Sequence, residues 1–140
     1  MKIGKITYFK NRRQFNRWLK QNHDKKEYLW LLFYKKHIKK PSLTLDEAVE
    51  EALCYGWIDG ILKSIDNKKH VIRFSPRRPN SFWSRHNINR VIKMIKQKKM
   101  RQPGRDTLPE KLLEKLEKHQ THLKIPKNRK LSRKFGVKIY

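Results

Sequence analysis

The stretch at residues 28–34, YLWLLFY, constrains the fold more than any other part of the chain, because it is apolar at every position. A strand with one face in water alternates apolar and polar residues, so a run that is apolar on both faces predicts a strand buried in the middle of a sheet. It is also the longest wholly apolar run, and it is far too short to cross a bilayer. We therefore expect no transmembrane segment.

Three other segments are expected in the same sheet. Residues 3–9, IGKITYF, predict a short strand, and the runs WIDGILKSI and HVIRFS flank the polar turn DNKK. Two such runs around a polar turn are typical of an antiparallel hairpin. The sheet is therefore expected to be small, and either mixed or antiparallel.

Capping residues indicate where the first two helices begin. Asn11 with Gln14, and Thr44 with Glu47, have the three-residue spacing of capping pairs, and an apolar stripe follows each pair. Gly56 stands where a glycine commonly follows the end of a helix. Two helices are thus expected, one before and one after the buried strand.

Two more helices are expected in the second half of the chain. Ser81 is expected to cap a third helix that contains Trp83 and is stopped by Pro103 and Gly104, and another helix is expected from Thr107. Together, the segments predict an α+β domain in which three to four helices pack against a sheet that contains a β-hairpin.

The length of 140 residues indicates one domain, which we place at residues 1–118, followed by a mobile basic tail at residues 119–140. The single cysteine, Cys54, excludes an intrachain disulfide and is expected in the core. No signal peptide, metal-ligand spacing or phosphate-binding glycine loop is found, so we expect a cytoplasmic protein without metal or cofactor. The oligomeric state stays open.

The charge balance indicates the kind of partner. Lys and Arg number 37 against 12 Asp and Glu, which gives a formal net charge of +25. Such a charge attracts anionic ligands, nucleic acid among them. The alternative is a lysine-rich composition without a functional meaning, and the sequence leaves both interpretations open.

The segment PRRPNSFWSRHN at residues 76–87 predicts an anion-binding site. Flanking prolines restrict the backbone around Arg77 and Arg78, whose planar guanidinium groups suit phosphate or carboxylate. Ser81, Ser84 and Asn87 add hydrogen-bonding groups beside an expected helix start, which favours anions. Trp83 is either a wall of the pocket or a core residue.

The turn GWIDG at residues 56–60 is expected to complete the site through Trp57 and Asp59. Asp59 either orients Arg77, Arg78 or a ligand, or is a structural carboxylate that caps a turn or pairs with an arginine of the next strand. A small enzyme is the alternative function, in which Asp59 is a general acid or base, Arg77 neutralises the substrate, and Ser81 or Ser84 orients it.

The segments ALCYGWIDG, RFSPRRPNSFWSRHN and KMRQPG resemble the YdeI/OmpD-associated family, also called bacteriocin-protection proteins. The resemblance covers roughly residues 7–118. It implies a small cytoplasmic α+β domain linked to envelope stress or antimicrobial-peptide resistance, without an established activity. A third hypothesis, a stress protein that acts through protein contacts, follows from this resemblance, although a chain this basic should repel cationic peptides.

Overall fold

The computed structural model describes residues 1–119, and side chains up to residue 115. A four-stranded sheet has the order β1-β2-β4-β3, in which β1 is parallel to β2 and the other neighbours are antiparallel. Its strands are β1 (Ile6–Thr7), β2 (Leu29–Tyr34), β3 (Trp57–Ser64) and β4 (Lys69–Pro76). The helices are α1 (Arg12–Asn22), α2 (Leu45–Cys54), α3 (Arg85–Lys96), α4 (Gln102–Arg105) and α5 (Glu110–His119). The α+β prediction is confirmed.

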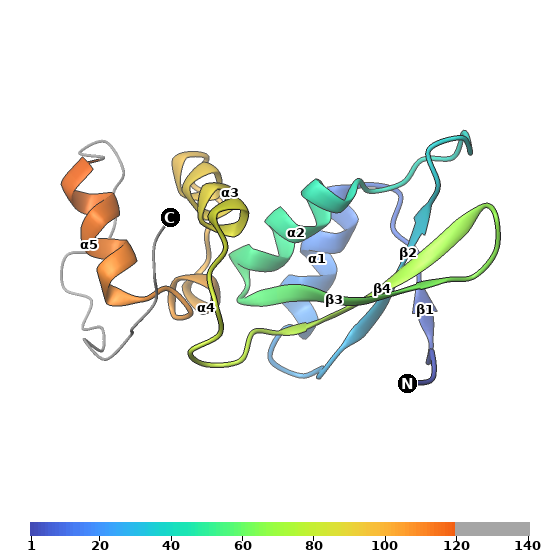
Figure 1. The fold of residues 1–140 in the computed structure, drawn as a ribbon, viewed down its shortest axis with the longest axis horizontal. Helices are drawn as coiled ribbons and strands as arrows, with labels where there is room; N and C mark the ends of the chain where they lie inside the picture. The colour runs from blue at the N-terminus through green and yellow to red at the C-terminus, as the bar shows by residue number, and fades with distance from the viewer. Residues whose placement is uncertain (120–140) are drawn as a thin grey trace.

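Helices α1 and α2 cover one face of the sheet, while α3, α4 and α5 gather beyond the end of the sheet that lies away from the β3–β4 turn (Figure 1). The Asn11 and Thr44 caps are confirmed, since both side chains accept hydrogen bonds from backbone N–H groups of their own helix. The predicted basic tail, residues 119–140, lies outside the described residues apart from the last residue of α5.

Strand β2 lies inside the sheet, as the YLWLLFY run predicts, with one face buried and the other face partly buried. Leu31 and Phe33 join the main core under the helices, whereas Trp30 points to the other face and is still only 1% exposed. A Cβ on Gly4 would lie 3.8 Å from the Trp30 ring, so the N-terminal residues cover that ring. The strand expected at residues 3–9 is shorter than predicted, since only Ile6–Thr7 pairs with β2.

The predicted hairpin is present as β3 and β4, with an irregular register between Asp59 and Leu62. Gly60 lies in this bulge, where an added Cβ would come within 3.0 Å of the Arg73 carbonyl oxygen. Trp57, at the start of β3, is 1% exposed and meets the Trp18 ring edge to face at 5.5 Å.

Two carboxylates in the middle of α2 are buried, although the sequence pattern does not place them there. Glu50 is 5% exposed and Glu51 is 1% exposed. Each carboxylate has two cationic partners within 3 Å: Arg12 and Lys93 at Glu50, and Arg12 and Lys99 at Glu51. Asn16 also donates to Glu51 at 2.8 Å. The charges of α2 therefore join it to α1, α3 and the chain after α3.

The expected course of the third helix is wrong at its end. Helix α3 stops at Lys96, and Lys98 has a left-handed backbone with φ 59°. Pro103 and Gly104 then lie inside the short helix α4, where proline suits the first turn. An added Cβ at Gly104 would lie 2.4 Å from the Cys54 carbonyl oxygen, so α4 packs directly on the backbone of α2. The last helix begins at Glu110 rather than near Thr107.

Replacing Glu51 by glutamine is expected to lower the free energy of unfolding by about 2–3 kcal/mol. Breaking a fully buried ion pair costs about 3–5 kcal/mol, and the cost here is smaller because Arg12 and Lys99 keep some contact with water. Burial alone raises the pKa of Glu51, but hydrogen bonds from Lys99, Asn16 and Arg12 outweigh it and hold the pKa below its ordinary value. The advantage of Glu51 is thus complete above the unfolded-state pKa of about 4.3, and is lost as the pH falls through the lower pKa of the folded state. Urea unfolding at several pH values tests this expectation.

The matched control is Glu27→Gln, because Glu27 is exposed and lies outside this network. It should change stability by less than about 0.5 kcal/mol at any of these pH values. Equal effects of the two substitutions would contradict a structural role for the buried carboxylate.

Candidate anion site

The loop after β4 is fastened to the end of α2. The backbone N–H of Arg77 donates to the Gly56 carbonyl oxygen at 2.9 Å. Gly56 has φ 76°, and an added Cβ would lie 2.8 Å from the Pro103 carbonyl oxygen, so this position requires glycine. A turn follows, in which Ser81 N–H donates to the Arg78 carbonyl oxygen and Asn80 has φ 62°. The loop is therefore held by its backbone at both ends.

The Arg77 side chain lies inside this loop. Its guanidinium carbon is 3.8 Å from the centre of the Trp83 ring, and Nη2 donates to Ser81 Oγ at 2.8 Å and to the Phe82 carbonyl oxygen at 3.2 Å. Both acceptors are neutral, and no carboxylate in the described part of the chain forms an ion pair with Arg77. Burial lowers the pKa of Arg77 to about 10, so the group stays charged at neutral pH.

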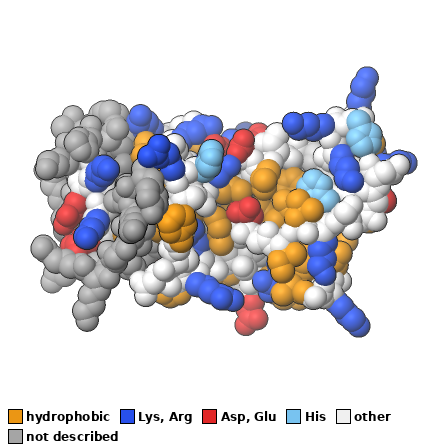
Figure 2. All heavy atoms as spheres, in the orientation of Figure 1, with side chains coloured by type: hydrophobic (Ala, Val, Ile, Leu, Met, Phe, Trp, Pro, Cys, Tyr) orange, Lys and Arg blue, Asp and Glu red, His pale blue; other side chains and the backbone are white. Residues whose placement is uncertain are grey.

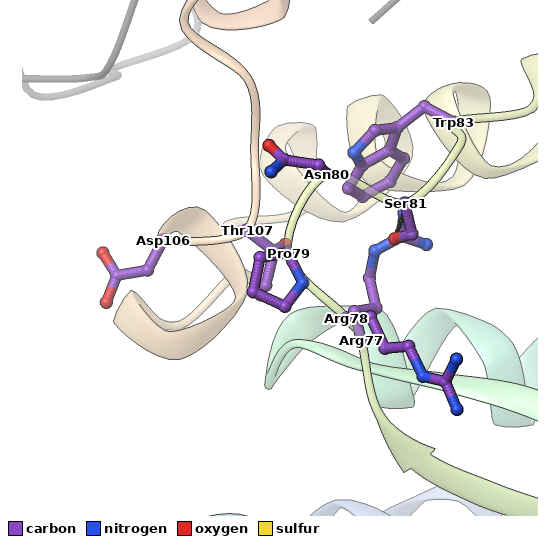
Figure 3. A pocket seen from close by; sticks show the side chains of 8 residues that line it. All are labelled: Arg77, Arg78, Pro79, Asn80, Ser81, Trp83, Asp106 and Thr107. Carbon is purple, nitrogen blue, oxygen red and sulfur yellow. Dashed lines mark hydrogen bonds between the residues drawn. The ribbon is translucent and has the colours of Figure 1, made fainter. Parts of the chain in front are cut away.

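These residues border a cavity of about 140 Å³, which we call the Arg77 pocket. It is lined by Arg77, Arg78, Pro79, Asn80, Ser81, Trp83, Asp106 and Thr107. Figure 3 shows the loop on one side and the end of α4 on the other, with Pro79 close to Thr107. The Asp106 carboxylate accepts a hydrogen bond from Gln102 at 2.6 Å. The pocket thus presents a half-buried cation between a loop and a short helix.

Four of the eight residues predicted for the site line the Arg77 pocket: Arg77, Arg78, Ser81 and Trp83. Trp57 belongs to the core instead. Asp59 lies opposite Phe74 on the hairpin and forms no ion pair with either arginine in the described structure. Asn87 accepts from Arg90 at 2.9 Å on α3. The enzyme hypothesis pairs Asp59 with Arg77, and these two side chains form no ion pair in the described structure.

The predicted start of the third helix is corrected by three residues. Ser84, not Ser81, is the N-cap, and its hydroxyl accepts from the Asn87 backbone N–H at 3.2 Å. The Ser81 hydroxyl accepts from Arg77 instead. Trp83 consequently lies before α3 rather than one turn inside it, and it is 2% exposed. This placement puts the buried ring against the arginine.

Four lining residues were not predicted from the sequence: Pro79, Asn80, Asp106 and Thr107. Pro79 and Asn80 stand inside the segment already singled out, so the Pro-Asn pair was an available turn signal. Asp106 and Thr107 come from α4 and its end, and no spacing in the sequence relates them to Arg77.

Other chemistry finds little support in the described residues. No group of three His, Cys, Asp or Glu side chains there could hold a metal ion. Burial raises the pKa of the Cys54 thiol to about 12, which leaves it un-ionised at neutral pH. Among the described helices, none has the length and apolar character that a bilayer crossing needs.

Comparison with known families adds one match. A family model described as "Domain of unknown function (DUF8412)" matches residues 7–107, which include every element from α1 to α4 and the whole Arg77 pocket. No curated protein and no solved structure matches the chain. The match does not bear on the resemblance to the YdeI/OmpD-associated family, which stays a prediction. The chain belongs to the DUF8412 family, whose description assigns no activity.

Ser84→Ala is expected to lower the free energy of unfolding by about 1 kcal/mol, because it removes the side-chain cap of α3. Ser81→Ala serves as its matched control, since Ser81 makes a hydrogen bond to Arg77 and caps no helix. Chemical denaturation of both variants, with helix content followed by circular dichroism, checks the assignment. A larger loss of helix signal from Ser81→Ala would contradict it.

Proposed function

We propose that this member of the DUF8412 family binds an anionic ligand in the Arg77 pocket, through a phosphate or carboxylate group. The observation that carries the proposal is a half-buried guanidinium with neutral hydrogen-bond acceptors and no carboxylate partner among the described residues. Removing a cation from water costs free energy unless an anion compensates it. A bound phosphate or carboxylate would supply that compensation.

The geometry also favours recognition over nonspecific attraction. Trp83 and Ser81 hold the guanidinium plane in one orientation, so little side-chain entropy is left to lose on binding. Both hydrogens of Arg77 Nη2 are used by Ser81 and Phe82, so the N–H groups of Nε and Nη1 are the donors left for an anionic group. Arg78 is exposed at the same pocket and adds a second cation.

The size of the pocket limits what it holds. Pockets that enclose whole small molecules measure about 300–1,000 Å³, and the Arg77 pocket has about 140 Å³. It therefore suits a single anionic group whose carrier extends outside. A phosphorylated or carboxylated metabolite and the backbone of a nucleic acid both offer such a group.

Net charge alone does not identify the site. Figure 2 shows Lys and Arg side chains spread around the outline of this face rather than gathered in one patch. Attraction of anions is thus a property of much of the surface, and specific binding has to be tested at Arg77 itself. A cytoplasmic location and a relationship to bacteriocin-protection proteins belong to the same proposal.

The test uses inorganic pyrophosphate as the probe in isothermal titration calorimetry. Arg77→Ala should weaken binding about 10–100-fold, the effect of losing hydrogen bonds to a charged group. Arg77→Lys should recover only part of the loss, because an ammonium lacks the planar group that stacks on Trp83 and has fewer donors than a guanidinium. The melting temperature of each variant is measured alongside.

Arg85→Ala is the matched control, since Arg85 is exposed at the start of α3, outside the Arg77 pocket, and its loss changes the net charge equally. It should change the affinity less than about twofold, as an exposed charge contributes little. Equal weakening by both substitutions would show nonspecific attraction. Unfolding of Arg77→Ala would make the arginine a structural residue and would sink the proposal.

A further inference from the structure

A second and larger hollow, of about 320 Å³, lies where the chain leaves α1 and enters β2. We call it the Lys25 hollow; three lysines and three aromatic residues define it: Lys5, Lys25, Lys26, Trp18, Tyr28 and Trp30. The parallel pairing of β1 with β2 brings the N-terminal segment and the α1–β2 loop to the same end of the sheet (Figure 1). The Lys25 hollow shares no lining residue with the Arg77 pocket.

The lysines of this hollow are available to a ligand. Lys25 and Lys26 follow α1 in a turn where both backbone N–H groups donate to the Asn22 carbonyl oxygen, at 3.0 and 2.9 Å. Their side chains and that of Lys5 are exposed. None of the three ammonium groups forms an ion pair within the described residues. The lining of the hollow therefore carries three lysines and one acidic residue, Glu27.

The aromatic residues differ in how firmly they are held. Trp18 rests edge-on against Trp57, and Trp30 is buried in the sheet, so both are fixed walls. Tyr28 is 45% exposed, and the Arg73 guanidinium lies 4.7 Å from the centre of its ring. An exposed ring paired with a guanidinium extends readily into a stack with another flat, electron-rich ring.

We infer that the Lys25 hollow binds one nucleotide of a single strand of nucleic acid, with the base on Tyr28 and the adjoining phosphates at Lys25 and Lys26. Lysines alone would suit any polyanion, and aromatic rings alone any flat ligand; a nucleotide needs both within one hollow. The bases of a duplex are stacked internally and do not reach such a ring, whereas those of a single strand do. The volume suits one base with its phosphate, at the lower limit of small-ligand sites of about 300–1,000 Å³.

The test measures fluorescence anisotropy of a labelled oligothymidylate with the full chain, across a salt series. Tyr28→Ala should weaken binding about fivefold or more, while Tyr28→Phe should keep the affinity. Lys25→Ala/Lys26→Ala should weaken binding and flatten the plot of log affinity against log salt by about 1.4, since each lost phosphate contact in a single strand contributes about 0.7. Melting temperatures should stay near that of the wild type, because Tyr28, Lys25 and Lys26 are exposed.

Three controls distinguish binding at the Lys25 hollow from nonspecific electrostatic attraction of the oligonucleotide to the basic surface. Lys36→Ala/Lys39→Ala removes the same charge from an exposed loop elsewhere and should change the affinity less than about twofold. Linear polyphosphate, which has no bases, should bind Tyr28→Ala as well as it binds the wild type. Free thymidine monophosphate should compete in the wild type but less well than the strand, because it offers fewer phosphates.

The inference does not rest on the Arg77 pocket, and the two can fail separately. It is overturned if Tyr28→Ala leaves oligothymidylate binding unchanged, or if the two lysine pairs have equal effects. It is also overturned if Tyr28→Ala weakens polyphosphate as much as the strand, or if only Arg77→Ala weakens the strand, which would assign the strand to the Arg77 pocket.

Discussion

Glu50 and Glu51 place two carboxylates side by side in the interior, at the point where three helices meet. Two buried negative charges in neighbouring positions would be strongly unfavourable without partners. Arg12 from α1 lies between them and contacts both, while Lys93 and Lys99 approach from α3 and from the chain after it. The position of α2 is thereby set by charge as well as by its apolar side, because a shift of either neighbouring helix would remove one of the two cationic partners of a buried carboxylate.

This arrangement reaches the Arg77 pocket through the C-terminal end of α2. Lys99, which holds Glu51, is two residues before Arg101, whose backbone N–H donates to the Cys54 carbonyl oxygen at 3.1 Å. The chain then forms α4, one side of the pocket. The other side begins at Arg77, bonded to Gly56 just past the same helix end. Both walls of the pocket are thus placed by α2, although neither belongs to it.

The sequence predicted those parts of the fold that depend on neighbours along the chain. The YLWLLFY run, the hairpin around DNKK and the caps at Asn11 and Thr44 are all local patterns, and all are confirmed. Ser81 and Ser84 are both suitable caps by residue type; in the folded chain Ser84 caps α3, whereas the Ser81 hydroxyl accepts a hydrogen bond from Arg77. The sequence pattern alone did not distinguish these two roles.

The parts that the sequence did not predict depend on contacts between distant segments. Glu50 and Glu51 have the composition of a solvent-facing stripe, and only partners 35 to 48 residues away make their burial favourable. Asp106 and Thr107 likewise line the Arg77 pocket beside residues that are distant from them in the sequence. For the candidate site, the PRRPNSFW segment supplied one wall, while the wall formed by α4 required the tertiary structure.

Gly56 and Gly104 allow the two walls of the Arg77 pocket to pack backbone against backbone. Gly56 packs against the backbone of Pro103, and Gly104 packs against the backbone of Leu53 and Cys54. A Cβ atom at either glycine would be too close to these backbone atoms. The spacing between the two walls is therefore set by main-chain contact, which hardly compresses, rather than by side chains that can change rotamer. Pro79 and Asn80, which are exposed, therefore form the part of the border of the Arg77 pocket that these main-chain contacts do not fix.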